Sequence, residues 1–160
     1  IESGQDGPPV DESALIRLRD AQAHRGPDDA GAWLDERGRV GLAHRRLSII
    51  DLSKHGRQPM FGPSKKTAII YNGEIYNHRS LRRQLEGLGY VFQTDHSDTE
   101  VLLHGYRQWG RELTSKLNGM WAFSLYDREN GLLWLSRDRF GKKPLFYMCL
   151  HYLKIGLQSK

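Results

Sequence analysis

The chain has 160 residues, of which 38% are hydrophobic, and a formal net charge of +5. This length is typical of a single domain, and no apolar run approaches the roughly 20 residues of a membrane-spanning helix. The first residues also lack the basic and apolar segments of a signal peptide. Basic residues lie in small separate groups without aromatic side chains on which bases could stack, which argues against a nucleic-acid-binding surface. We therefore expect a cytoplasmic protein that binds neither a membrane nor a nucleic acid.

Cysteine and histidine usage restricts the chemistry further. Cys149 is the only cysteine, which excludes an internal disulfide and a multi-cysteine metal site. It lies beside an apolar run, where a buried thiol is a better interpretation than a nucleophile. The seven histidines are dispersed without HExxH spacing, and neither a Walker loop nor GxGxxG is present. We expect no metal and no cofactor in this domain.

Apolar periodicity and turn residues predict helices interspersed with antiparallel hairpins. Asp11 can cap the first helix, and Ser97 with Glu100 matches the capping box of a later one. Asn130 and Gly131 are a typical hairpin signal. The expected elements, in chain order, are a helix over 12–24, strands over 32–35 and 40–50, a loop over 53–65, a strand over 67–71, a helix over 79–88, a strand over 91–94, helices over 97–109 and 111–117, and strands over 120–127, 132–138 and 143–147.

Strands 120–127 and 132–138 are mostly apolar on both faces. Strands that are covered on both sides have this composition, whereas half-exposed strands alternate. Together with several helices, they suggest two packed sheets with helices outside. No internal repeat or linker divides the chain, so we expect a single domain over 1–160.

The stretch YNGEIYN at 71–77 contains the first candidate site. It follows the apolar strand, and we expect that strand to end at Asn72 and Gly73. Gly73 allows a ligand to approach its backbone N–H closely, and Asn72 offers amide donors. Two adjacent neutral donors suit an oxyanion hole for acyl transfer. On this dipeptide alone, a tight turn is the commoner meaning of Asn-Gly.

Three charged residues are candidates for substrate binding. Arg46 presents a planar fork that suits a carboxylate, although a surface ion pair is an equal alternative. Asp98, at a helix N-terminus, is held ionised and suits an ammonium group, or it only stabilises the helix. Glu74 is either a ligand contact or a solvated charge. With two oxyanion donors, this set suits an α-amino acid with a reactive side-chain carbonyl, such as glutamine.

Six longer motifs carry a more specific signal than these single residues. In chain order they are HRGPDDAG at 24–31, GLAHRRLSIIDLS at 41–53, YNGEIYN at 71–77, SDTE at 97–100, LNGMWAFSLYD at 117–127 and RDRFGKKPLF at 137–146. The chain resembles the glutaminase domain of glutamine-hydrolysing asparagine synthetases, which are class II glutamine amidotransferases. The resemblance extends from about His24 to Tyr147.

The resemblance implies an α+β fold of the N-terminal-nucleophile hydrolase type, a four-layer αββα sandwich of two antiparallel sheets. It implies that Arg46 holds the glutamine α-carboxylate and that Asp98 binds the α-amino group. Asn72 and Gly73 would form the oxyanion hole, and Glu74 would contact the amino-acid end. The substrate pocket would be lined by Leu47, Ser48, Ile49 and Ile50.

The chain departs from this family at both ends. Family members use an N-terminal Cys as the nucleophile and its free amine as the base. Here position 1 is Ile, and no Cys precedes Cys149. We expect that the strand with the nucleophile is missing, that the chain is truncated at both ends, and that this fragment is inactive without the Cys. The resemblance also implies a C-terminal synthetase domain, absent here, that uses ATP and Mg²⁺.

The leading hypothesis is a glutaminase domain that hydrolyses L-glutamine to glutamate and ammonia. The ammonia would serve ATP-dependent asparagine synthesis from aspartate in the following domain. The alternative is a catalytically inactive scaffold domain without the Cys, similar to that of β-lactam synthetase. A homodimer remains an open alternative for the oligomeric state.

Overall fold

The computed structural model describes residues 1–2, 7–47 and 56–148. Its helices and strands, in chain order, are α1 (Glu12–Asp20), the 3-10 helix η1 (Ala23–Arg25), β1 (Asp29–Leu34), β2 (Gly41–Arg46), β3 (Met60–Phe61), β4 (Thr67–Ile75), α2 (His78–Gly87), α3 (Asp98–Trp109), the 3-10 helix η3 (Gly110–Glu112), α4 (Leu113–Lys116), β5 (Gly119–Asp127) and β6 (Leu132–Arg137). The paired strands of both sheets are antiparallel, which confirms the predicted α+β class.

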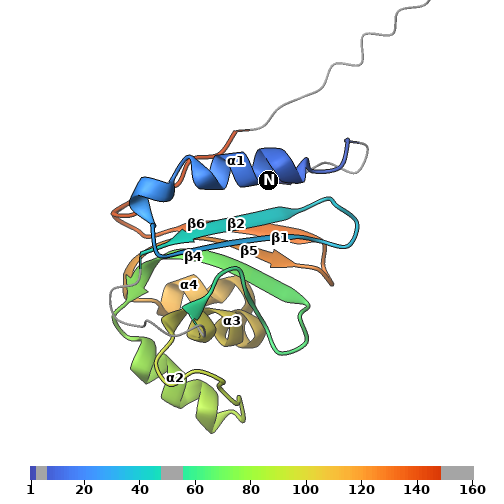
Figure 1. Cartoon of the computed structure of the whole chain (residues 1–160). Helices are drawn as coiled ribbons and strands as arrows, with labels where there is room; N and C mark the ends of the chain where they lie inside the picture. The colour runs from blue at the N-terminus through green and yellow to red at the C-terminus, as the bar shows by residue number, and fades with distance from the viewer. Residues whose placement is uncertain (3–6, 48–55, 149–160) are drawn as a thin grey trace, which may run out of the picture.

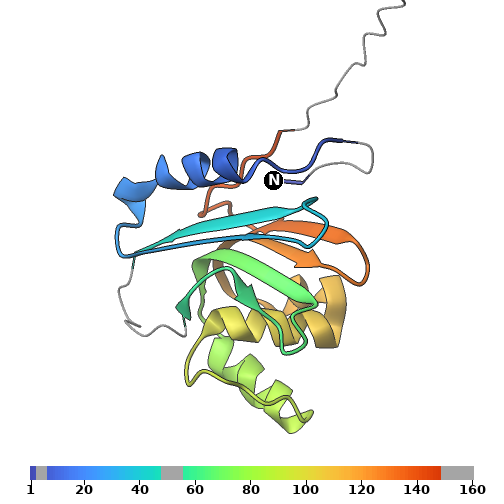
Figure 2. The same cartoon turned by 45° about the vertical axis from the view of Figure 1, so that its right-hand side comes forward.

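Figure 1 shows four layers in the order helix, sheet, sheet, helix. Helix α1 covers the outer face of the two-stranded β1-β2 sheet, which lies on a four-stranded sheet of order β3-β4-β5-β6. Helices α3 and α4 lie on the opposite face, with α2 packed against α3 farther from the sheet, and the turned view in Figure 2 shows the same order. This arrangement confirms the αββα sandwich expected of an N-terminal-nucleophile hydrolase fold.

Strand β4 separates two cores, because alternate side chains of a strand point to opposite faces. Ile69, Tyr71 and Ile75 pack in a large cluster with side chains of α2, α3 and β5. Ala68 belongs to a smaller cluster that includes one residue of β2 and one of β5, against which Ile70 packs. Coverage of both faces is the reason that this strand is apolar throughout its first half.

Asn72 and Gly73 lie inside β4, so both the expected strand end and the turn interpretation are wrong. The strand continues to Ile75, and Gly73 pairs with Trp121 of β5. A Cβ atom on Gly73 would lie 2.2 Å from the Met120 carbonyl oxygen. The glycine therefore serves the close approach of two strands, and the continued pairing with β5 overrides the local turn preference.

The strand expected over 91–94 is absent from this part of the described chain. The backbone N–H groups of Gln93 and Thr94 donate to the Glu100 carboxylate at 2.7 and 2.8 Å. These donors are used by a side chain of α3, and the segment forms an irregular connection from α2 to α3.

The prediction of a strand over 143–147 is also wrong, because the backbone at the start of this segment forms its hydrogen bonds with side chains and not with a neighbouring strand. The Lys143 N–H donates to Asp138 Oδ2 at 3.0 Å, and the Lys143 carbonyl accepts from Arg137 Nε at 2.7 Å. Phe146 and Tyr147 are more than three-quarters exposed, at 91% and 79%. The described residues here follow β6 without pairing to a strand.

The loop expected over 53–65 is only partly right, because strand β3 lies inside it and pairs with β4, and residues 53–55 are outside the described residues. The remaining expected elements are present with shifted ends. The first helix ends at Asp20 and is followed by η1, and the piece expected over 111–117 is divided between η3 and α4. Asn130 and Gly131 lie in the turn between β5 and β6, as predicted. Strand β2 ends at Arg46, and the rest of the strand expected over 40–50 falls partly outside the described residues.

Glu100 should make the stability of this fold sensitive to acid. Burial by itself raises the pKa of Glu100, but the neighbouring His104 ring and hydrogen bonds from Thr94 and Gln93 outweigh it and lower the pKa from 4.5 to about 2. The stabilisation is therefore complete above the unfolded pKa and is lost as the pH falls toward about 2. Glu100→Gln should flatten the dependence of the unfolding free energy on pH between about pH 5 and pH 2, measured by urea titration. Glu112→Gln, an exposed control, should keep the wild-type dependence, and an unchanged slope in Glu100→Gln would contradict the assignment.

Candidate active site

One edge of β4 brings predicted site residues together with new ones. In an antiparallel pair, every second residue bonds to the partner strand and the residues between point their N–H groups the other way. In β4 the Tyr71 and Ile75 N–H groups point away from β5. The Tyr71 N–H donates to Gln58 Oε1 at 2.6 Å, and the Ile75 N–H donates to Asp98 Oδ2 at 3.1 Å.

The Gly73 N–H lies between these two donors and points to the same edge. Strand β3 pairs only with Ile69 and Ala68, so it does not reach this position. Within residues 1–2, 7–47 and 56–148, no group accepts a hydrogen bond from the Gly73 N–H. A backbone donor in this position is open to an oxygen atom of a ligand.

Asp98 is anchored to β4 through one of its two carboxylate oxygens. It is the first residue of α3, and the Ser97 hydroxyl caps the helix by accepting from the Glu100 N–H. Asp98 Oδ2 accepts from the Tyr71 hydroxyl at 2.8 Å as well as from Ile75. Asp98 Oδ1 has no hydrogen-bond donor among the residues that the structure describes. This free oxygen, at a half-buried position, is suited to an ammonium group.

Tyr71 is protonated in this environment. Burial first, and then the neighbouring Asp98 carboxylate, raise the pKa of the Tyr71 phenol far above its ordinary value. The hydroxyl therefore remains a donor to Asp98. Since Tyr71 also contributes its N–H to Gln58, one residue of β4 orients groups on both sides of the Gly73 N–H.

Arg46 is the last residue of β2 and lies two positions after His44 on the same strand. The Arg46 carbonyl accepts from the Asp28 N–H at 3.0 Å, and a Cβ on Gly56 would lie 2.4 Å from Arg46 Nη2. Burial, and to a smaller degree the charge of Arg46, lower the pKa of His44 to about 4, so this ring is neutral at neutral pH. The neighbouring Tyr71 backbone by itself raises the pKa of the His44 ring.

The remaining predicted residues are more exposed. Asn72 and Glu74 are exposed and share the face of β4 that lies away from α2 and α3. Leu47 follows β2 and is 54% exposed. Three further predicted pocket residues lie outside the described residues: Ser48, Ile49 and Ile50.

Sequence reasoning missed three residues at this corner, namely His44, Gln58 and Tyr71. The sequence pattern indicates only an apolar strand residue at Tyr71, and Gln58 falls in a segment expected to be an exposed loop. His44 stands in the quoted motif AHRR, which was the available signal, but only Arg46 received a role from it. Contacts of side chains with a free strand edge leave no periodic pattern in the sequence.

Neither a metal centre nor a membrane span is found in the described part of the chain. Among residues 1–2, 7–47 and 56–148, no group of three or more His, Cys, Asp or Glu side chains is arranged to hold a metal ion. None of the described helices has both the length and the apolar composition needed to cross a membrane.

Comparison with known families agrees with this geometry. Residues 4–159 match the model of the glutamine amidotransferase domain, and the chain belongs to this family. More particularly, relatives that match most of this chain are glutamine-hydrolysing asparagine synthetases, which confirms the resemblance seen in the motifs.

Asparagine synthetase [glutamine-hydrolyzing] 1 of Bacillus subtilis (strain 168) is 46% identical over 143 residues, which cover 89% of this chain and 22% of that protein. Asparagine synthetase B [glutamine-hydrolyzing] of Escherichia coli (strain K12) is 42% identical over 131 residues, which cover 82% of this chain and 23% of that protein. The chain thus spans about a fifth of the length of these relatives. A solved structure of glutamine phosphoribosylpyrophosphate amidotransferase from B. subtilis matches 55% of this chain and 21% of its own, with a TM-score of 0.46 and 28% identity.

The hydrogen bond from Tyr71 to Asp98 should be measurable as stability. Tyr71→Phe removes only the hydroxyl, and we expect the free energy of unfolding to fall by about 1–2 kcal/mol in urea titrations, because the acceptor is charged and partly buried. Tyr76→Phe is the matched control, since Tyr76 lies on the same segment and is 52% exposed. Equal effects of the two substitutions would argue against the bond.

Proposed function

We propose that this chain is the glutaminase domain of a glutamine-hydrolysing asparagine synthetase, which converts L-glutamine to glutamate and ammonia. The observation that carries the proposal is the Gly73 N–H on the open edge of β4, two residues from the point where Asp98 is anchored. A pair of features of this kind suits a substrate that has both a carbonyl to be polarised and an ammonium group. The 46% identity to a glutamine-hydrolysing asparagine synthetase supports glutamine as that substrate.

Each binding residue has a separate role in this proposal. The Gly73 N–H and the Asn72 amide stabilise the negative charge that develops on the amide oxygen. Asp98 Oδ1 accepts from the α-ammonium group, while Tyr71 keeps the carboxylate in place. Arg46 holds the α-carboxylate through two parallel N–H groups, and Glu74 contacts the amino-acid end.

The nucleophile in this proposal is a cysteine thiol from residues that precede Ile1 in the full-length protein. The Ile1 N–H donates to the Gly41 carbonyl and the Gly41 N–H donates to the Ile1 carbonyl, both at 2.8 Å. Ile1 is therefore paired antiparallel to β2, and an extended segment before it would follow β2 toward Arg46. This direction leads to the corner where the carbonyl of glutamine would be bound.

The reaction then has two stages. The free α-amine of that cysteine takes the thiol proton, and the thiolate adds to the amide carbonyl to form a tetrahedral adduct. The resulting α-ammonium group gives the proton to the leaving nitrogen, so that the C–N bond breaks and ammonia is released as a thioester forms. Water attacks the thioester, releases glutamate and restores the thiol. Both additions place negative charge on the same oxygen, so the two donors near residue 72 assist both stages.

The greater length of the relatives supports a second part of the proposal. Because the chain spans about a fifth of those proteins, we place a C-terminal synthetase domain after it, which uses ATP and Mg²⁺ to activate aspartate for the released ammonia. The decisive experiment measures ammonia release from L-glutamine by the full-length protein, together with the intact mass of its N-terminal peptide. Absence of hydrolysis, with no cysteine before Ile1, would instead support a scaffold domain.

Asn72→Ala should strongly impair turnover in the full-length protein. Loss of one oxyanion donor typically lowers kcat by about 100-fold or more, and we expect this size of decrease with little change in KM. Gln84→Ala, at an exposed position on α2, serves as the control and should keep the wild-type rate. A near-normal kcat in Asn72→Ala would remove this residue from the oxyanion hole.

Arg46→Gln should have the opposite kinetic signature. Because the α-carboxylate does not react, loss of its partner is expected to raise the KM for glutamine about tenfold or more with a smaller effect on kcat. Arg83→Gln, an exposed arginine of α2, is the matched control for the loss of one positive charge. If steady-state kinetics give an unchanged KM in Arg46→Gln, the carboxylate is bound elsewhere.

A further inference from the structure

A buried glutamine on the segment before β3 has a hydrogen-bond donor that the fold does not use. Gln58 is 9% exposed, and its Oε1 atom accepts from the Tyr71 N–H at 2.6 Å. Because a backbone N–H can only donate, the oxygen of the carboxamide faces Tyr71 and the nitrogen, Nε2, faces elsewhere. Among the residues that the structure describes, no group accepts a hydrogen bond from Nε2.

This unused nitrogen is open to a ligand. Within the described part of the chain, one side-chain nitrogen or oxygen is both fully enclosed and without a partner, and that atom is His104 Nδ1. Gln58 Nε2 is therefore in contact with solvent, although the residue as a whole is buried. A donor at the tip of a buried side chain suits an oxygen atom of a bound molecule.

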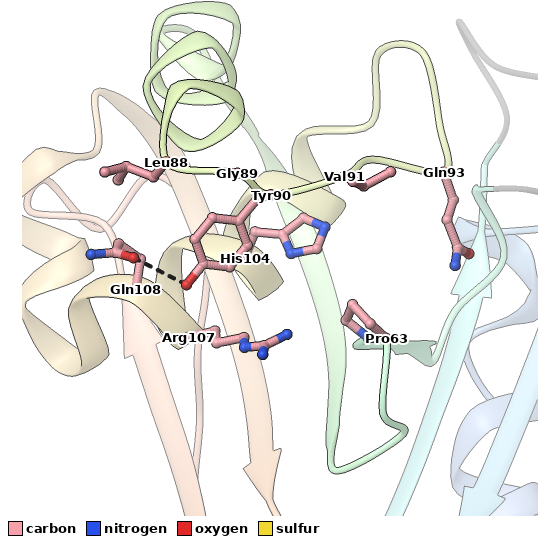
Figure 3. A pocket seen from close by; sticks show the side chains of 9 residues that line it. All are labelled: Pro63, Leu88, Gly89, Tyr90, Val91, Gln93, His104, Arg107 and Gln108. Carbon is pink, nitrogen blue, oxygen red and sulfur yellow. Dashed lines mark hydrogen bonds between the residues drawn. The ribbon is translucent and has the colours of Figure 1, made fainter.

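The cavity beside α3 offers no comparable donor. It has a volume of about 520 Å³ and lies between α3, the segment that follows α2 and the turn after β3 (Figure 3). His104 belongs to its wall, but the unpaired Nδ1 atom is enclosed, so no molecule in the cavity can contact it. None of the residues that line this cavity lies on β4.

Gln58 lies at one end of a row of three N–H groups on the open edge of β4. The Tyr71 N–H donates to Gln58, the Ile75 N–H donates to Asp98, and the Gly73 N–H lies between them. Alternate residues of a strand are about 7 Å apart, and bond lengths of about 1.2 and 1.3 Å keep Nε2 within about 5 Å of the Tyr71 nitrogen. A ligand oxygen on this part of the edge can therefore accept from both the Gly73 N–H and Gln58 Nε2.

The backbone around Gln58 is held between the two sheets. A Cβ atom on Gly31 of β1 would lie 1.8 Å from the Gln58 carbonyl oxygen, so the segment crosses β1 in contact with its backbone. Two residues before Gln58, a Cβ atom on Gly56 would lie 2.4 Å from Arg46 Nη2 of β2. The segment thus contacts β1, β2 and the edge of β4, and a donor fixed in this way needs no rearrangement when charge develops on a substrate.

We propose that Gln58 is a further catalytic residue of the glutaminase reaction, whose Nε2 atom donates to the amide oxygen of glutamine. The inference rests on the proposed function and adds a third donor to Asn72 and Gly73. With the ammonium group at Asp98 and the amide oxygen at Gly73, the substrate lies along the edge of β4, and Gln58 lies beside its amide end. The oxygen of the tetrahedral adduct has one more lone pair than the carbonyl oxygen, so all three donors can bond to it.

This third hydrogen bond is strongest in the transition state. It forms as negative charge develops on the oxygen, so it lowers the barrier more than it improves binding of the substrate. Gln58 keeps both of its amide protons throughout, because it stabilises the charge and takes no part in proton transfer. Its loss should therefore appear mainly in kcat.

Gln58→Glu in the full-length protein separates this role from a structural one. Glutamate still accepts from the Tyr71 N–H, but in its ionised form it has no donor for the substrate. We expect kcat for glutamine hydrolysis to fall about 100-fold or more, while KM changes less than about threefold. Gln84→Glu, an exposed control on α2 with the same change of charge, should keep the wild-type kcat and KM.

Gln58→Met provides a second variant if Gln58→Glu does not fold, because methionine is neutral, has a similar length and lacks the donor; the same loss of kcat is expected. The inference is overturned if the folded variant keeps a kcat within about threefold of the wild type, or if KM rises by the factor by which kcat falls, as a purely structural role would cause. A wild-type protein that releases no ammonia overturns the proposed function and this inference with it. An active wild type with an equally active Gln58→Glu variant overturns the inference alone.

Discussion

The anchoring of Asp98 on the edge of β4 is the interaction on which the candidate active site depends. Its Oδ2 atom accepts from the Tyr71 hydroxyl and the Ile75 N–H, so one oxygen joins the helical layer to the four-stranded sheet. The same contact leaves Oδ1 available and positions it two residues from the open Gly73 N–H. The Asp98 carboxylate therefore holds the helix to the sheet through Oδ2 and offers Oδ1 to a ligand.

Helix α3 organises the molecule on both of its sides. Its residues Val101 and Leu102 are fully buried in the larger core, which fixes the helix against β4 and β5. With the helix immobile, Asp98 at its first position reaches the strand edge, whereas Glu100 holds the connection from α2 and orients His104. Two carboxylates in one helical turn thus have different partners, because helix geometry points them in different directions.

Local signals in the sequence predicted those elements whose hydrogen bonds are also local. The Ser97 capping box marks the start of α3, and Asn130 with Gly131 marks the turn between β5 and β6, both as found. The same reasoning failed at Asn72 and Gly73, where nine residues of β4 pair with β5 and outweigh the turn preference. It failed at 91–94 because the backbone donors there bond to a side chain rather than to a strand.

The sequence by itself determined the class of elements, the family of the chain and the residue types that could bind an amino acid. Only the tertiary structure decided that the Gly73 N–H is open, that Tyr71 and Ile75 share the Asp98 oxygen, and that His104 Nδ1 lacks a partner in the described chain. The physical reason is the separation of the partners: Tyr71 and Asp98 are 27 positions apart. Periodicity records which face of an element is buried, but not which distant group meets each donor at its edge.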